Sequence, residues 1–110
     1  MAPLADYATV GTWLADYARH WGDNDPGVRR NLGILQEFCD RVGKNPDEIV
    51  AECLRTTEAG ARIRPKARRR YVASIDEFEA NHPLGRRAGN AVRSFLIHNG
   101  VAVSASVPGS

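Results

Sequence analysis

The sequence predicts a small all-α domain of four to five helices. The chain has 110 residues, which is enough for one domain with one core. Apolar residues make up 43% of it, a normal fraction for a globular protein. Several segments repeat apolar residues at helical spacing, and none shows sustained alternation of apolar and polar residues. We therefore expect a helical domain over residues 1–103 and a linker or tail over residues 104–110.

The first two helices are expected over residues 9–20 and from residue 26 to residue 42. Asp25 is a suitable N-cap for the second helix, and Pro26 suits its first position. The first helix places four apolar side chains on one face, namely Trp13, Leu14, Tyr17 and Trp21. The apolar stripe of the second helix consists of Leu32, Leu35, Phe38, Cys39 and Val42.

Three further helices follow in the second half of the chain. Asn45 and Glu48 approximate a capping box and predict the start of a short third helix. Residues 59–61, Ala-Gly-Ala, are expected to loosen the chain after it. A fourth helix is predicted over residues 65–80, and a His-Pro pair breaks it. A fifth helix is predicted over residues 84–98, and an Asn-Gly pair ends it.

The net charge of +2 conceals an asymmetry between the two halves of the chain. Residues 1–54 contain five basic and nine acidic side chains, whereas residues 55–110 contain ten basic and four acidic ones. A strongly basic half of a small domain favours a polyanionic partner.

Paired arginines occur at the predicted starts of three helices, in the pattern Pro-x-x-Arg-Arg. The pattern covers residues 26–30, 65–69 and 83–87. A cation at a helix N-terminus is disfavoured by roughly 0.3–1 kcal/mol. Three exceptions to this rule indicate a use for the arginines, and a guanidinium beside free helix N–H groups binds phosphate well. The alternative is that some of these arginines pair with surface carboxylates such as Asp76, Glu77 and Glu79, or are simply solvated.

Seven aromatic residues fall at positions expected of core side chains rather than of base-stacking platforms, which favours a duplex over a single strand as the partner. These residues are Trp13, Tyr17, Trp21, Phe38, Tyr71, Phe78 and Phe95.

Several other functions lack their sequence signals. The chain has no glycine-rich phosphate loop, no His-Glu-x-x-His motif and no convincing nucleophile with its base, so we expect no catalytic residues, small-molecule substrate or cofactor. Cys39 and Cys53 are expected to be buried and reduced, and no histidine lies at zinc-finger spacing from them, so no metal site is expected. No apolar run approaches the ~18 residues of a membrane span, and the N-terminus lacks the features of a secretory signal. We therefore expect a cytoplasmic protein without membrane partners.

Two segments resemble the tyrosine recombinase and phage integrase family. Residues 32–44, Leu-Gly-Ile-Leu-Gln-Glu-Phe-Cys-Asp-Arg-Val-Gly-Lys, resemble a family helix of the type Leu-x-x-Phe that ends near Gly-Lys. Residues 91–101, which begin Ala-Val-Arg-Ser-Phe, resemble the closing helix of the family's N-terminal domain. The resemblance implies a SAM-like helical bundle, the core-binding domain, which forms half of a clamp around a duplex recombination site. It also makes neighbouring recombinase protomers possible partners on DNA.

The resemblance places two DNA-facing helices at the predicted second and fifth helices. Arg29 and Arg30 fall at the start of the first of these. On the second, Asn90 or Arg93 is expected to reach base edges while other basic residues hold phosphates. Together with the charge argument for the fourth helix, the candidate DNA-binding residues are Arg29, Arg30, Asn31, Lys66, Arg69, Arg70, Arg86, Arg87, Asn90 and Arg93.

The chain departs from the family in three respects. The family usually has Thr near the start of both DNA-facing helices and Tyr four residues later, positions taken here by Gly27, Asn31, Leu84 and Ala88. Residues 46–80 form a longer segment than in compact members, as though a helix had been added. The catalytic His-x-x-Arg is absent, so we expect a non-catalytic domain. The alternatives are a SAM-like protein–protein interaction module and a small helical RNA binder.

Overall fold

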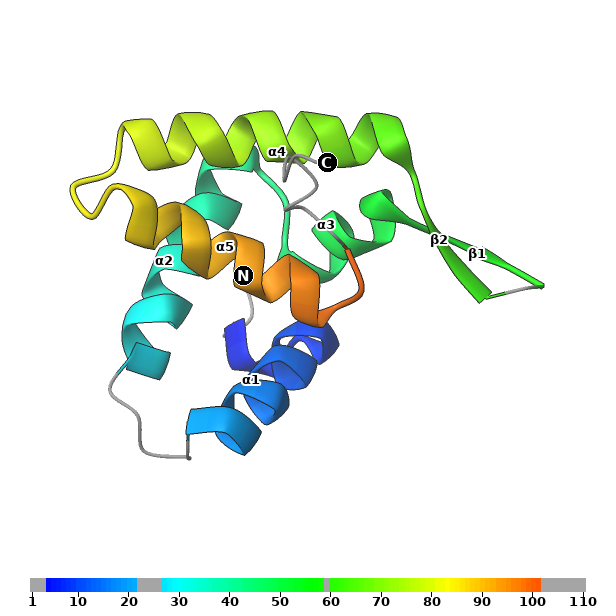
Figure 1. Cartoon of the computed structure of the whole chain (residues 1–110), viewed down its shortest axis with the longest axis horizontal. Helices are drawn as coiled ribbons and strands as arrows, with labels where there is room; N and C mark the ends of the chain where they lie inside the picture. The colour runs from blue at the N-terminus through cyan, green and yellow to red at the C-terminus, as the bar shows by residue number, and fades with distance from the viewer. Residues whose placement is uncertain (1–3, 22–26, 59, 102–110) are drawn as a thin grey trace.

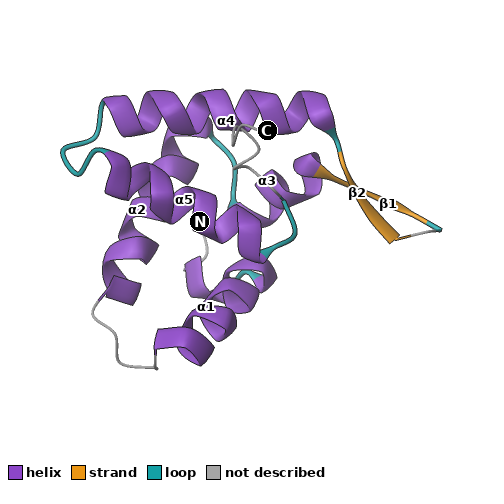
Figure 2. Cartoon of the chain, in the orientation of Figure 1, coloured by secondary structure: helices purple, strands orange, loops and turns teal. Residues whose placement is uncertain are grey.

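Five α-helices and one short β-hairpin form the part of the chain that the structure, a computed structural model, describes: residues 4–21, 27–58 and 60–101 (Figure 1). The elements in chain order are the 3₁₀ turn η1 (Leu4–Asp6), α1 (Ala8–Trp21), α2 (Gly27–Val42), α3 (Pro46–Cys53), β1 (Leu54–Thr57), β2 (Gly60–Ile63), α4 (Pro65–Ala80) and α5 (Arg86–His98). Helices dominate the fold (Figure 2), which confirms the predicted small all-α bundle.

Local sequence signals account for several helix ends. The Asn45 side chain accepts a hydrogen bond from the Glu48 backbone N–H at 2.8 Å, and the Glu48 carboxylate accepts one from the Asn45 N–H at 2.9 Å. This reciprocal pair is the predicted capping box. Helix α4 has the predicted bounds, with Pro65 in its first turn. The proposed cap Asp25 and Pro26 lie outside the described residues.

The fifth helix begins two residues later than predicted, at Arg86 rather than Leu84. Gly85 is its N-cap and has a φ of 57°, a left-handed conformation that favours glycine. A helix therefore cannot pass through this residue, and Leu84 belongs to the turn that precedes it. Arg86 and Arg87 therefore occupy the first two positions of α5.

The β-hairpin was not predicted, and it occupies the segment where the sequence suggested an added helix. Strands β1 and β2 pair antiparallel, with Leu54 opposite Ile63 and Thr57 opposite Gly60. Four-residue strands are too short for a clear alternating pattern, which explains the omission. The hairpin projects away from the helices (Figure 1), and the Arg64 N–H donates to the Cys53 carbonyl oxygen at 2.7 Å across its base.

Helix α5 occupies the centre of the bundle, in contact with α1, α2 and α4. Its Phe95 is fully buried and meets Trp13 edge to face, with ring centroids 5.6 Å apart. The largest fully buried side chains include Trp13, Phe38, Phe95, Leu35, Ile49 and Ile75. Five of the seven aromatic residues predicted as core are buried, which confirms them, while the side chains of Tyr17 and Trp21 lie outside the described part. Val101 is also fully buried, so the folded domain includes it; the predicted boundary at residue 103 lies beyond the described residues.

Candidate nucleic-acid interface

A shallow groove of about 240 Å³ lies between the first halves of α2 and α5. Arg30 and Asn31 line it from α2, and Arg87 and Asn90 line it from α5. The groove therefore brings together four of the ten candidate residues from positions far apart in the chain. Ile34 and Ser94 also line it, and the Ser94 hydroxyl accepts a hydrogen bond from the Trp13 indole N–H at 3.1 Å.

The four arginines at these two helix starts are exposed and available. Arg29, Arg30, Arg86 and Arg87 make no ion pair with any other residue of the described part of the chain. Neither helix has an acidic residue in its first turn. Carboxylate pairing is thus excluded for these four arginines within the described residues, and no carboxylate in the first turn of either helix offsets the positive field there.

Arg93 has a different environment from the other candidates. Its guanidinium donates to Glu79 at 2.7 Å and to Asp76 at 2.9 Å, both on α4, and its side chain is 22% exposed. Burial works to lower the pKa of Arg93, but the bonds to Glu79 and Asp76 outweigh it and raise that pKa. Gly89 makes room for this arrangement, because a Cβ there would collide with the Glu79 carboxylate. Arg93 therefore joins α5 to α4. Of the two residues expected to reach base edges, Asn90 is the one that remains available.

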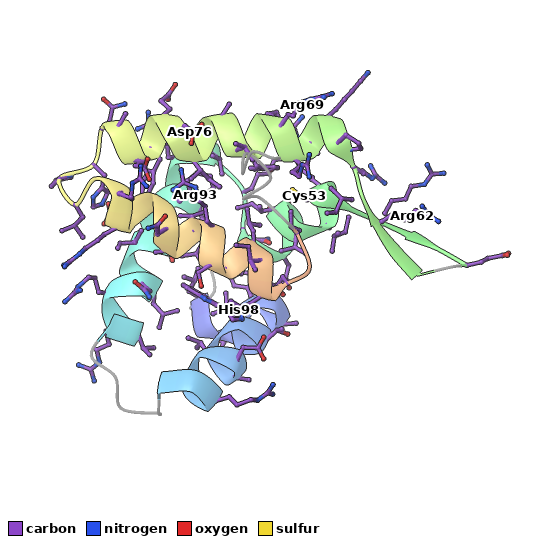
Figure 3. The ribbon with its side chains drawn as sticks, viewed as in Figure 1. Cys53, Arg62, Arg69, Asp76, Arg93 and His98 are labelled. Atoms are coloured by element: carbon purple, nitrogen blue, oxygen red, sulfur yellow. The ribbon has the colours of Figure 1, made fainter. Side chains whose placement is uncertain are left out.

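The candidate residues on α4 also include both ion-paired and unpaired cations. Arg70 donates to Glu52 at 2.7 Å and lies over the Tyr71 ring, whereas Lys66 and Arg69 are exposed and make no ion pair within the described residues. Figure 3 shows Arg69 on the part of α4 nearer the hairpin that carries Arg62, with Asp76 further along the helix. Arg55, Arg62 and Arg64 were not among the candidates, although the basic excess after residue 54 pointed to their segment.

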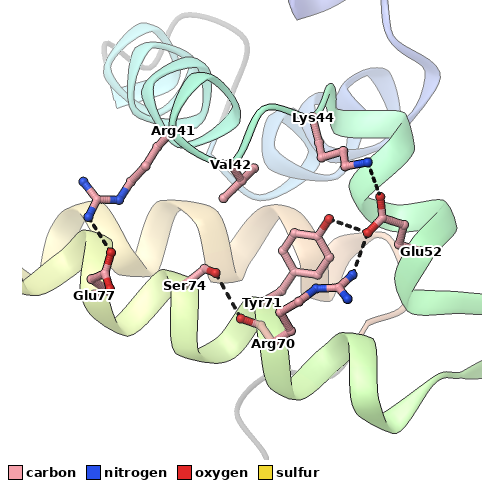
Figure 4. A pocket seen from close by; sticks show the side chains of 8 residues that line it. All are labelled: Arg41, Val42, Lys44, Glu52, Arg70, Tyr71, Ser74 and Glu77. Atoms are coloured by element: carbon pink, nitrogen blue, oxygen red, sulfur yellow. Dashed lines mark hydrogen bonds and ion pairs between the residues drawn. The ribbon is translucent and has the colours of Figure 1, made fainter.

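A cavity of about 790 Å³ lies where α2, α3 and α4 meet (Figure 4). Each of its three cations is paired with a carboxylate: Arg41 pairs with Glu77 at 2.6 Å, and Lys44 and Arg70 share Glu52. The Tyr71 hydroxyl also donates to Glu52 at 2.8 Å. Two carboxylates hold all three cations, so one positive charge is in excess but none of the lining cations is unpaired. This cavity is therefore a poorer anion site than the groove between α2 and α5, whose arginines have no carboxylate partner in the described part of the chain.

Glu52 makes the stability of the domain depend on pH. The hydrogen bond from Tyr71, assisted by Lys44 and Arg70, lowers the pKa of Glu52 below its ordinary 4.5. The ionised carboxylate therefore stabilises the folded state above pH 4.5, and this contribution is lost as the pH falls through the lowered pKa. Urea unfolding of wild type and Glu52→Gln is expected to give a difference in unfolding free energy that shrinks below pH 4.5. Glu58→Gln, which removes an exposed carboxylate, should give no such trend; a constant difference for Glu52→Gln would contradict the assignment.

The cysteines and histidines have structural surroundings. Cys39 and Cys53 are buried free thiols, and burial raises their pKa values to about 12 and about 11. His82 contacts Glu37 at 2.9 Å, and His98 contacts Asp16 at 3.0 Å. Within residues 4–21, 27–58 and 60–101, no group of three or more potential ligands could hold a metal ion.

Comparisons of the chain with protein-family models, with curated proteins and with solved structures gave no match. No helix in the described part combines the length and the apolar character needed to cross a membrane.

Proposed function

We propose that this chain is a duplex-DNA-binding domain of the kind that precedes the catalytic domain in tyrosine recombinases and phage integrases. The observation that carries the proposal is the groove between α2 and α5, with Arg30, Asn31, Arg87 and Asn90 on its walls. The domain itself performs no chemistry. Its partner is double-stranded DNA in the cytoplasm, where further recombinase protomers would bind beside it.

The groove's chemistry suits a duplex. Unpaired arginines at two adjoining helix starts can grip phosphates through paired hydrogen bonds, supported by the helix dipoles. Asparagine amides have the donor and acceptor needed to read adenine in the major groove. Asn90 is exposed, and its amide oxygen accepts from Arg93 at 3.0 Å, so the tethered Arg93 helps to orient it.

The resemblance to the recombinase family points to the same two helices. Residues 32–44 cover most of α2 and its end, and residues 91–101 cover the second half of α5. The family's two DNA-facing helices would thus correspond to the pair that lines the groove. This agreement between charge, geometry and sequence resemblance supports the proposal.

A protein–protein interaction module is less well supported by the surface. Such a surface normally has a contiguous apolar patch. The large apolar side chains exposed in the described part are Leu84 and Ile97, which are 41% and 46% exposed. They lie 13 positions apart along α5 and its preceding turn, which corresponds to about 20 Å.

The test is a salt titration of binding to a 20-base-pair duplex, measured by fluorescence anisotropy. Each phosphate contact contributes about −0.9 to the slope of log K against log salt. We expect Arg30→Ala with Arg87→Ala to make the slope shallower by about 1.8 and to weaken binding. Thermal stability should stay unchanged or rise slightly, because a cation is removed from the start of α5.

The charge-matched control is Arg19→Ala with Arg41→Ala, which removes two arginines that pair with carboxylates on α1 and α4. It should leave the slope unchanged. Wild-type protein that fails to bind the duplex at low salt, or that gives no NMR shift changes near Arg29, Arg30 and Arg86, would overturn the proposed function.

A further inference from the structure

The β-hairpin places two arginines directly opposite each other. Arg55 of β1 pairs in register with Arg62 of β2, and both are exposed. Neither forms an ion pair with another residue of the described chain. Like charges opposite each other on neighbouring strands destabilise the pairing. A two-stranded hairpin has little stability of its own, so this arrangement works against the element that contains it.

Three more unpaired cations adjoin the hairpin. Arg64 precedes α4, and Lys66 and Arg69 follow in its first turns; all three are exposed and without an ion pair in the described part. They line a cavity of about 640 Å³ that also contains apolar Pro65. Its one acidic residue, Glu52, is already held by Lys44 and Arg70. We call Arg55, Arg62, Arg64, Lys66 and Arg69 the basic arm.

The basic arm is separate from the α2–α5 groove. It lies at the N-terminal end of α4, whereas α5 and its arginines follow the C-terminal end. The 16 residues of α4 span about 24 Å between them. Figure 1 shows the hairpin at one end of α4 and the turn into α5 at the other.

We propose that the basic arm is a second contact surface for the phosphates of duplex DNA. Residues 54–69 contain no aromatic side chain, so the arm has no platform for stacking single-stranded bases. A projecting two-stranded ribbon matches the width of the major groove, and its arginines bind phosphates on either side. The repulsion between Arg55 and Arg62 is relieved when a polyanion binds. This inference rests on the proposed function and adds a site outside the groove.

The test variant is Arg55→Thr with Arg62→Thr. Threonine suits a strand, and opposed threonines pair favourably, so the thermal midpoint should stay unchanged or rise. Binding to the 20-base-pair duplex is expected to weaken, and the slope of log K against log salt to become shallower by about 1.8, for two lost contacts. Arg55→Lys with Arg62→Lys keeps both charges and should retain the wild-type slope.

The two proposals fail in different ways. The basic arm is refuted if wild type binds the duplex and loses affinity with Arg30→Ala and Arg87→Ala, while the threonine variant binds with unchanged affinity and slope. If the threonine variant loses as much affinity for single-stranded DNA of the same length as for the duplex, the basic arm does not select duplex DNA. That result would also overturn the inference. The proposed function fails separately if wild type does not bind the duplex at all.

Discussion

Replacing Phe95 with alanine is expected to lower the free energy of unfolding by about 3–5 kcal/mol. Phe95 is fully buried on the central helix α5, and its ring packs edge to face with Trp13. Truncation would remove this contact and leave a cavity where α1 and α5 meet. Domains of this size are stable by only about 5–15 kcal/mol, so the variant should unfold at a much lower urea concentration. Urea unfolding followed by circular dichroism measures the difference.

Ile97→Ala is the matched control for Phe95→Ala. Ile97 is two residues further along the same helix and is 46% exposed, so its loss should change stability by no more than about 0.5 kcal/mol. Similar losses for both variants would contradict the assigned role of packing against Trp13, because alanine is the better helix former at either position and a loss of stability at Ile97 is not expected.

Replacing Arg93 with alanine is expected to lower the unfolding free energy by about 1.5–3 kcal/mol. Arg93 joins α5 to α4 through Glu79 and Asp76. Glu79 is only 22% exposed, so its carboxylate would lose its partner in a partly buried position. The measurement is the shift in the urea midpoint, with duplex affinity determined in parallel at a temperature where both proteins are folded.

The control for Arg93→Ala is Asp76→Asn, which removes the more exposed of the two carboxylate partners. Asp76 is 63% exposed, and such pairs contribute about 0–1 kcal/mol. A stable Arg93→Ala variant that binds DNA much more weakly would instead return Arg93 to the interface. A small loss of DNA affinity in Arg93→Ala would still agree with a structural role for Arg93, because Arg93 is hydrogen-bonded to Asn90 and its removal would disturb that residue.

The helices of this domain could be predicted from sequence because each has a local cause. The Asn45 capping box and the apolar stripe of α2 act over a few residues, and the structure contains both. The predicted start of α5 was wrong because Gly85 adopts a left-handed conformation that depends on the turn around it. The hairpin was missed because its register depends on pairing between segments, which a single strand's pattern does not reveal.

The candidate interface was likewise predictable only where its signal lies in the local sequence. Charge position along the chain indicated Arg30 and Arg87, and the structure brings them to one groove. The sequence could not separate these available arginines from Arg70 and Arg93, because ion pairing depends on which carboxylates the fold places nearby. Arg55 and Arg62 were overlooked for a related reason, since their opposition exists only in the paired hairpin.

The groove joins helix starts that are remote in the chain, and this couples recognition to folding. Arg30 and Arg87 become neighbours only when α2 packs against α5. The unfolded chain has no equivalent site, so a ligand that engages both selects the native state by mass action. At a ligand concentration of 100 times Kd, this linkage adds about 2.7 kcal/mol to stability. The occupied domain would therefore open less often and survive proteolysis longer than the same domain released from its ligand.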